Sequence, residues 1–284
     1  KDPGKTTPMT SIAERLDAVR ARMRQRGLDA LIVPRADEYL GEYIPAHNER
    51  LRWISGFTGS AGVVIVLADA AAIFVDGRYT VQVRQQVSAE LFEFLHLVDE
   101  PHARWLGKRL DKGKRVGYDP HMHSLTWQKK TADTLARSGV ELMALDENLV
   151  DLCWHDRPQA ARHPAILMEA RYTGKSSADK RREIGAAIAE QGAEAALVFA
   201  ADSVAWLLNI RGSDVPHLPL VLGYALLFAD GRLTFFTDPL KIPAGFDAHT
   251  GAGVEVLAEN EAHAAFRALA GMRVLADPDT ANAW

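Results

Sequence analysis

The chain has 284 residues, of which 48% are hydrophobic and 25% are charged, with a formal net charge of -4. These values are typical of a globular protein that is long enough for two domains. They argue against a nucleic-acid-binding surface, and no apolar run approaches the roughly 20 residues of a membrane span. A single cysteine, Cys153, excludes an internal disulfide and a cysteine-rich metal site, which favours a cytoplasmic location.

The first half of the chain predicts alternating helices and strands. Residues 1–8 are expected to be a tag or a disordered extension. An amphipathic helix follows over 11–27, because Ile12, Leu16 and Val19 recur at three- and four-residue steps before Gly27. Strands are then expected over 29–33, 63–67, 72–75, 91–95, 116–118 and 141–145, and helices over 79–88, 101–110 and 124–138.

A linker rich in proline and charge, residues 156–164, predicts a boundary between two domains, 9–160 and 161–284. The second domain is expected to contain helices over 178–191 and 259–270, and strands over 194–199, 219–228, 232–237, 254–257 and 273–276. This alternation predicts an α/β fold with mixed sheets flanked by helices.

The two halves carry the same sequence pattern. Residues 27–37 return as 192–202 with a shift of 165, and residues 53–60 return as 206–213 with a shift of 153. The first copy therefore has twelve extra residues between these blocks. A third block around Phe74 and Asp76 returns around Phe235 and Asp238. The sequence thus predicts two tandem copies of one fold.

Three short motifs suggest chemistry but are better explained by structure. The segment 56–62 lacks the glycine that a serine-hydrolase nucleophile needs, so we interpret it as a glycine turn before a strand. The segment 174–176 lacks the first glycine of a phosphate loop and is interpreted as a helix start. His121 and His123 have no third ligand at a suitable spacing, which favours a loop with solvated histidines over a metal site.

Two segments remain as candidates for a functional surface. Asp76–Tyr79 follows a strand and precedes a helix, where Arg78 can project into a cleft. The alternative for Arg78 is a structural ion pair with Asp76 or a neighbouring carboxylate, and the residues leave this open. The second copy has Asp238 or Pro239 at about the position of Arg78. The polar segment 209–219 also suggests a surface that meets another domain or a substrate.

Seven motifs, in order and spacing, resemble the first two domains of the three-domain Xaa-Pro aminopeptidases, or aminopeptidases P, of the M24 metallopeptidases. These motifs are Gly41–Pro45, Ser55–Gly62, Asp76–Tyr79, Glu147–Asp151, Trp154–Pro158, Tyr172–Gly174 and Trp206–Asp214. The resemblance implies two creatinase N-terminal-like domains. It also implies a parent enzyme that releases the N-terminal residue from peptides with proline second, using two divalent metal ions, usually manganese.

In that family the metals are held by two Asp, one His and two Glu of a third domain with the pita-bread fold, and none of those motifs is found in this sequence. The resemblance therefore implies that the catalytic domain is absent from this chain, which would hold no metal, cofactor or catalytic residue. It places Arg78 at the substrate. The partners for which the resemblance leaves room are peptides with proline second, the C-terminal catalytic domain and a second copy of the protein in a homo-oligomer, with no nucleic acid or membrane.

A second hypothesis comes from a different class. Peptidase-like domains of this kind are also reused as peptide- or protein-binding modules without enzymatic activity, because a fold does not fix a function. A parent sequence with an intact set of metal ligands would favour the enzyme, and a degenerate set would favour the binding module.

Overall fold

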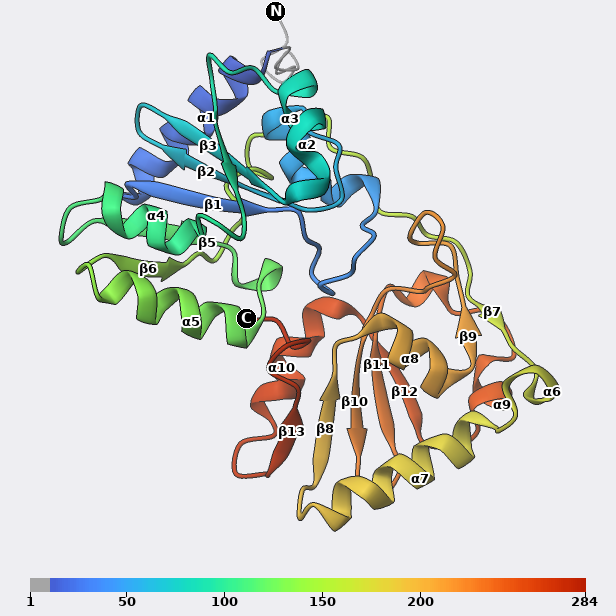
Figure 1. Ribbon diagram of the computed structural model, residues 1–284. Helices are drawn as coiled ribbons and strands as arrows, with labels where there is room; N and C mark the ends of the chain where they lie inside the picture. The colour runs from blue at the N-terminus through green and yellow to red at the C-terminus, as the bar shows by residue number, and fades with distance from the viewer. Residues whose placement is uncertain (1–10) are drawn as a thin grey trace, which may run out of the picture. The chain divides into compact units, whose positions relative to one another are not determined.

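The computed structural model describes residues 11–284, so the expected extension at 1–8 lies outside the described residues (Figure 1). The chain packs as two compact units. The first comprises residues 11–37, 46–159 and 283–284, and the second comprises residues 38–45 and 160–282. The segment 38–45, which falls within the twelve-residue insertion of the first copy, thus packs with the second unit.

The first unit contains a six-stranded mixed sheet in the order β4-β3-β2-β1-β5-β6. Its strands are β1 (Ala30–Pro34), β2 (Gly62–Leu67), β3 (Ala71–Val75), β4 (Glu93–His96), β5 (Arg115–Tyr118) and β6 (Glu141–Ala144). The neighbours β1/β2 and β2/β3 are antiparallel, and the other three pairs are parallel. Sequence prediction located all six strands, with ends that differ by a few residues.

The helices of the first unit are α1 (Ile12–Arg26), α2 (Arg50–Ser55), α3 (Thr80–Gln86), α4 (His102–Arg109) and α5 (Leu125–Ala136). Alternate side chains of β1 point to opposite faces of the sheet, as the pleat of a strand requires. Leu31 and Val33 join a core with α1 and α2, whereas Ile32 joins a core with α4 and α5. The helices therefore cover both faces of this sheet (Figure 1).

The second unit contains a five-stranded mixed sheet in the order β12-β11-β10-β8-β13 and a small β7–β9 pair. Its strands are β7 (Ile166–Leu167), β8 (Ala195–Val198), β9 (Ile210–Arg211), β10 (Tyr224–Phe228), β11 (Leu233–Phe236), β12 (Val254–Leu257) and β13 (Val274–Ala276). Its helices are α6 (Ala170–Thr173), α7 (Ser177–Glu190), α8 (Ala201–Leu208), α9 (Phe246–Thr250) and α10 (Ala262–Arg267).

The two sheets share one topology, which confirms the predicted duplication. Strands β8, β10, β11, β12 and β13 have the same neighbours and directions as β1, β2, β3, β4 and β5. Ala30 pairs with Leu67 in the first unit, and its counterpart Ala195 pairs with Phe228 in the second. Strand β6 has no counterpart among the strands described in the second unit.

Two predicted elements differ from the structure. The strand expected over 219–228 begins only at Tyr224, because residues 212–222 turn back on themselves and Gly212 N donates to the Pro219 carbonyl oxygen at 3.2 Å. The helix expected over 259–270 starts as a 3-10 turn and becomes α-helical only over Ala262–Arg267. Over residues 11–284, no helix combines the length and the apolar character of a membrane span.

Candidate functional site

Arg78 lies where β3 ends and a helical segment begins. A 3-10 turn, Gly77–Tyr79, follows β3, and α3 starts directly after it. The carboxylate of Asp76 caps this turn by accepting a hydrogen bond from the Arg78 backbone N–H at 2.9 Å. This hydrogen bond holds the backbone of Arg78 in place, so its side chain extends from this end of the sheet.

The Arg78 side chain also forms an ion pair with Asp76. Its Nη2 lies 2.7 Å from Oδ2 of Asp76, and its Nε lies 3.1 Å from the same oxygen. These hydrogen bonds lower the pKa of the Asp76 carboxyl below its ordinary value. Yet 64% of the Arg78 side chain is exposed. The ion pair considered from sequence is therefore present, and it leaves the guanidinium at the surface, where a ligand can reach it.

Tyr79 anchors this turn to the glycine-rich segment before β2. Its hydroxyl lies 2.6 Å from Ser60 Oγ, and its ring meets the edge of Phe57. A Cβ built on Gly59 would come within 2.2 Å of the Phe57 ring, so the close packing requires glycine here. The segment 56–62 is thus a glycine turn before β2, as predicted, and its contact with Tyr79 also supports the turn that contains Arg78.

The second unit repeats the turn without the arginine. The 3-10 turn Pro239–Lys241 follows β11, and Asp238 caps it by accepting from the Leu240 N–H at 3.0 Å. The counterpart of Arg78 is therefore Leu240, and the sequence comparison with Asp238 or Pro239 was wrong by one or two positions. The β10–β11 hairpin contains one residue more than the β2–β3 hairpin, which shifts the alignment.

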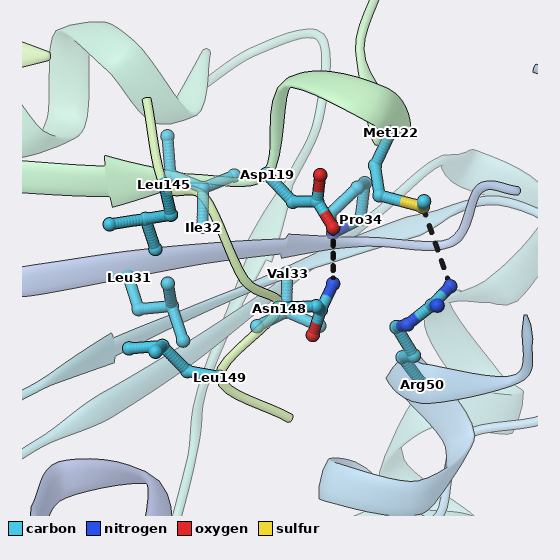
Figure 2. A pocket seen from close by; sticks show the side chains of 10 residues that line it. All are labelled: Leu31, Ile32, Val33, Pro34, Arg50, Asp119, Met122, Leu145, Asn148 and Leu149. Atoms are coloured by element: carbon cyan, nitrogen blue, oxygen red, sulfur yellow. Dashed lines mark hydrogen bonds between the residues drawn. The ribbon is translucent and has the colours of Figure 1, made fainter. Parts of the chain in front are cut away.

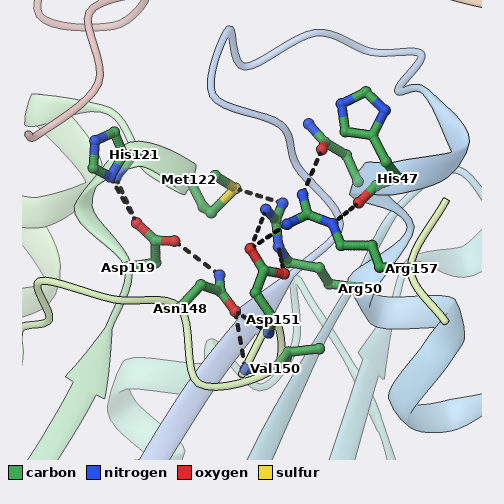
Figure 3. Close-up of polar contacts among 10 residues, drawn as sticks. His47, Arg50, Asp119, His121, Met122, Asn148, Val150, Asp151 and Arg157 are labelled. Atoms are coloured by element: carbon green, nitrogen blue, oxygen red, sulfur yellow. Dashed lines mark hydrogen bonds and ion pairs between the residues drawn. The ribbon is translucent and has the colours of Figure 1, made fainter. Parts of the chain in front are cut away.

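A polar cluster, which includes residues of two of the seven motifs but was not predicted as a cluster, ties the end of the first domain to α2 (Figure 3). The two carboxylate oxygens of Asp151 accept hydrogen bonds from Nε and Nη2 of Arg50, at 2.7 and 2.8 Å. Arg157 donates to Asp151 at 2.7 Å and to the His47 carbonyl oxygen at 2.6 Å. Only 3% of Arg50 is exposed, whereas the side chains of Asp151 and Arg157 are 24% and 27% exposed, so the cluster runs from the interior to the surface.

A second group of contacts extends this cluster to the end of β5. Asn148 donates to Asp119 at 2.8 Å, and His121 lies 3.1 Å from the other oxygen of the same carboxylate (Figure 3). Burial acts to raise the pKa of Asp119, but the hydrogen bonds from His121 and Asn148 outweigh it, and the pKa is lowered. The hydrogen bonds from His121 and Asn148 thus give the Asp119 carboxylate a structural role.

The adjoining pocket is too small for a substrate. It is lined by Leu31, Ile32, Val33, Pro34, Arg50, Asp119, Met122, Leu145, Asn148 and Leu149 (Figure 2). Its volume is about 10 Å³, which accommodates at most one water molecule. The pocket and the polar cluster therefore serve packing, although two motifs of the family resemblance fall within them.

The interpretation of both histidines as solvated is wrong for His123. Residues 120–122 form a 3-10 turn, and His123 is 95% buried, with its ring stacked 3.5 Å from that of Trp127. Burial lowers the pKa of His123 to about 3. Among residues 11–284, no group of three or more His, Cys, Asp or Glu side chains is arranged to hold a metal ion. The described residues thus do not fit a metal centre.

The polar segment 209–219 makes internal contacts that its sequence did not reveal. Asp214 is buried and pairs with Lys241 at 2.7 Å. Asn209, at φ 52°, ends α8 and accepts a hydrogen bond from Lys180 at 2.6 Å. The exposed residues of the segment are Ser213, Pro216, His217 and Pro219. Much of its polarity therefore supports the fold of the second unit.

Comparisons with known proteins match both halves of the chain. A family described as Creatinase/Prolidase N-terminal domain matches residues 15–152, and a second family with the same description matches residues 156–284. The chain is 37% identical over 244 residues to a probable Xaa-Pro aminopeptidase P of Neurospora crassa. It is 32% identical over 237 residues to aminopeptidase P1 of Lotus japonicus.

These relatives are longer than the chain. The alignments cover 83% and 82% of this chain but 35% and 36% of the two curated relatives. Among solved structures, the chain is similar to an X-prolyl aminopeptidase from Caenorhabditis elegans, described as a cytosolic enzyme with a di-nuclear active site. That match has a TM-score of 0.90 at 26% identity and covers 96% of this chain and 48% of the other.

Proposed function

Because the chain belongs to the creatinase/prolidase N-terminal domain family and contains two such domains in tandem, we propose that it is the non-catalytic N-terminal part of a metal-dependent Xaa-Pro aminopeptidase. The observation that carries this proposal is the continuous similarity to aminopeptidases P across both units. The substrates would be peptides with proline at the second position. We further propose a cytoplasmic location for the parent enzyme, in line with the cytosolic relative.

The metal chemistry of such an enzyme would lie outside the described residues. These residues offer no group of ligands that fits the di-nuclear centre named for the worm relative. Two divalent ions, for which we expect manganese, would activate water in the catalytic domain. The two N-terminal domains, with bounds near 9–160 and 161–284, would instead restrict which peptides reach that domain and would contribute to oligomer contacts.

Within this chain we assign substrate contact to Arg78. A guanidinium carries a permanent charge and a planar set of donors, which suits peptide carbonyls and carboxylates. The Asp76 carboxylate orients it from within the same turn, and the side chain remains exposed. An exposed ion pair contributes only about 0–1 kcal/mol, so a ligand can compete for the guanidinium at little cost.

The test compares the longer protein that contains this chain with residues 1–284 alone. Each is assayed with manganese on a peptide with proline second and on a matched peptide with alanine second. We expect the longer protein to release the N-terminal residue only from the first peptide, and the 284-residue chain to release nothing.

Isothermal titration of the 284-residue chain with manganese completes the test. Turnover by this chain, or micromolar manganese binding at a defined site, would overturn its non-catalytic assignment. A longer protein that binds such peptides but never cleaves them would establish the binding module instead.

A further inference from the structure

The second unit carries an open apolar groove between α7 and α8. The groove has a volume of about 470 Å³ and is lined by Ile184, Val198, Asp202, Ser203, Trp206 and Leu207. Trp206 is 48% exposed and Ile184 is 38% exposed. A large exposed aromatic side chain beside an exposed isoleucine is typical of a surface that binds another polypeptide segment.

The duplication provides an equivalent groove for comparison. The lining residues Ile184, Val198, Ser203, Trp206 and Leu207 correspond, by the shifts of 165 and 153, to Val19, Val33, Arg50, Trp53 and Ile54. One hydrogen bond repeated in both units supports this alignment. Arg15 donates to the Trp53 carbonyl oxygen at 2.7 Å, and Lys180 donates to the Trp206 carbonyl oxygen at 3.0 Å.

In the first unit the equivalent groove is closed. Trp53 is only 6% exposed, and Val19 is fully buried. The residues that close it belong to the segment 145–157, which we call the covering segment. Leu149, Val150 and Cys153 of this segment join the core formed by α1, α2 and the sheet.

An aromatic contact and two ion pairs fasten the covering segment to α1 and α2, in addition to the hydrogen bonds of Asn148 and Arg157 described above. The ring of Trp154 stacks on that of Trp53, with centroids 5.9 Å apart. Asp151 pairs with Arg50 on α2, and Glu147 pairs with Arg26 on α1. An aromatic residue thus closes the groove, and acidic residues fasten the segment to basic helices.

The second groove has the aromatic residue but lacks basic residues at the positions of Arg26 and Arg50. Arg26 corresponds to Gln191 and Arg50 corresponds to Ser203, so the positions that bind the acidic residues carry no charge. The charged residue that lines the groove is Asp202, which is exposed. The matching occupant would be an apolar segment with an aromatic residue for Trp206 and a lysine or arginine for Asp202.

The position of the covering segment in the chain indicates the source of this occupant. In the first unit the segment directly follows β6, the last strand of its sheet. In the second unit β13 is the counterpart of β5, so the positions that would correspond to β6 and to the covering segment come after residue 284, and the relatives extend beyond the matched region. We propose that the α7/α8 groove binds an aromatic and basic segment located after residue 284 of the longer protein. This proposal rests on the proposed function.

A site-specific cross-link tests this inference in the longer protein. Trp206 is replaced by the photo-crosslinker p-benzoylphenylalanine, and the linked peptide is identified by mass spectrometry. We expect a link within the same chain, to a segment after residue 284 that contains an aromatic and a basic residue. A link to residues 11–284, or to a second copy or another protein, would overturn the proposal.

Two variants distinguish docking from general disturbance. Ile184→Asp places a charge in the groove and should abolish the cross-link. Leu240→Ala removes another exposed apolar side chain of the same unit, outside the groove, and should leave the yield unchanged. Circular dichroism melting checks that both variants fold. Equal cross-link yields in the two variants would contradict a docking site.

Hydroxyl-radical footprinting provides a second measurement. If the groove is closed as in the first unit, exposure of Trp206 falls from 48% toward the 6% of Trp53, and its oxidation should fall about eightfold relative to the 284-residue chain. Oxidation of Tyr172, which is 67% exposed, serves as the reference. Equal oxidation of Trp206 in both proteins would exclude docking.

Peptidase activity, measured in the same preparation, separates the two proposals. An active enzyme with an accessible Trp206 would contradict only the docking inference. An inactive protein with a protected Trp206 would contradict only the proposed function.

Discussion

Asp76 holds Arg78 in two ways across a single 3-10 turn, through a backbone hydrogen bond of 2.9 Å and an ion pair of 2.7 Å. The two contacts start from one carboxylate, so the residue that caps the turn also orients the guanidinium. In the second unit Asp238 makes the same backbone contact to Leu240, which cannot form the ion pair. The capping aspartate is therefore part of the repeated fold, whereas the arginine is present in the turn of the first unit and not in that of the second.

Under the proposed function, Arg78→Ala should impair peptide hydrolysis by the longer protein without affecting its folding. Loss of a hydrogen bond to a charged group costs about 1.5–3 kcal/mol, so kcat/KM should fall by roughly 10- to 150-fold. The melting temperature should change little, because the Arg78 side chain is 64% exposed. Steady-state kinetics on a proline-second peptide and thermal melting check both outcomes.

Arg109→Ala is the matched control for Arg78. Arg109 also lies in the first unit, is exposed and pairs with a carboxylate, that of Glu93 at 2.8 Å. It should leave the kinetics unchanged, whereas Arg78→Lys should restore only part of the activity because lysine lacks the planar donors. A variant at Arg78 with normal kinetics and a sharply lower melting temperature would assign the residue to structure.

Duplication and periodicity predicted the framework from sequence. The repeat of residues 27–37 at 192–202 predicted the shared topology, and the two αL glycines at the ends of α1 and α7, Gly27 and Gly192, lie in the repeat. Regular spacing of apolar residues is a local property, so strands such as β1 and helices such as α1 could be located. The helix α2 has no such signal, since all but one of its six residues are buried.

The side-chain roles could not be predicted in the same way, because they depend on contacts between distant residues. Arg50 and Asp151 are 101 positions apart, and the charge of each suggests a solvated surface, whereas the fold buries Arg50 against Asp151. His123 is only two positions from the partly exposed His121, yet the fold buries it against the ring of Trp127. Sequence alone thus located the Arg78 turn but could not distinguish an exposed ion pair from a buried one.

Lys180→Met should destabilise the second unit. The Lys180 Nζ donates to the Asn209 side-chain oxygen at 2.6 Å and to the Trp206 carbonyl oxygen at 3.0 Å, and Lys180 is only 2% exposed. Loss of these donors leaves polar groups unpaired, so urea unfolding should show a loss of about 1–3 kcal/mol. Lys175→Met removes an exposed lysine that pairs with Glu183 and should cost less than about 1 kcal/mol.

The buried pair Asp214–Lys241 should behave differently when one or both partners are replaced. Both side chains are less than 10% exposed and lie 2.7 Å apart. Lys241→Met alone leaves a buried carboxylate uncompensated and should cost about 3–5 kcal/mol in urea unfolding. The double variant Lys241→Met with Asp214→Leu should recover most of that loss. If the double variant is as unstable as Lys241→Met alone, the hydrogen bond that Asp214 accepts from the Leu222 N–H contributes more to stability than the ion pair does.

The exposed pair Arg232–Asp230 is the control for the variants of the buried pair Asp214–Lys241. Its atoms also lie 2.7 Å apart, but both side chains are more than half exposed. Arg232→Met should therefore change the free energy of unfolding by less than about 1 kcal/mol. A cost as large as that of Lys241→Met would show that burial does not set the difference.

Acid should destabilise the first unit through His123. Burial lowers the folded-state pKa of His123 to about 3, whereas an unfolded histidine titrates near 6.5. Above about pH 6.5 the imidazole is neutral in both states and contributes no pH dependence. As the pH falls from about 6.5 toward 3, only the unfolded state binds the proton, so stability should fall by about 1.4 kcal/mol per pH unit.

His123→Leu should reduce this slope of stability against pH, measured by urea unfolding from pH 7 to 4. Replacement of the exposed His155 by glutamine, His155→Gln, should leave the slope unchanged. An unchanged slope in His123→Leu would assign the acid sensitivity to other groups, of which the partly buried His102, with a pKa lowered to about 4 by burial, is the first to replace.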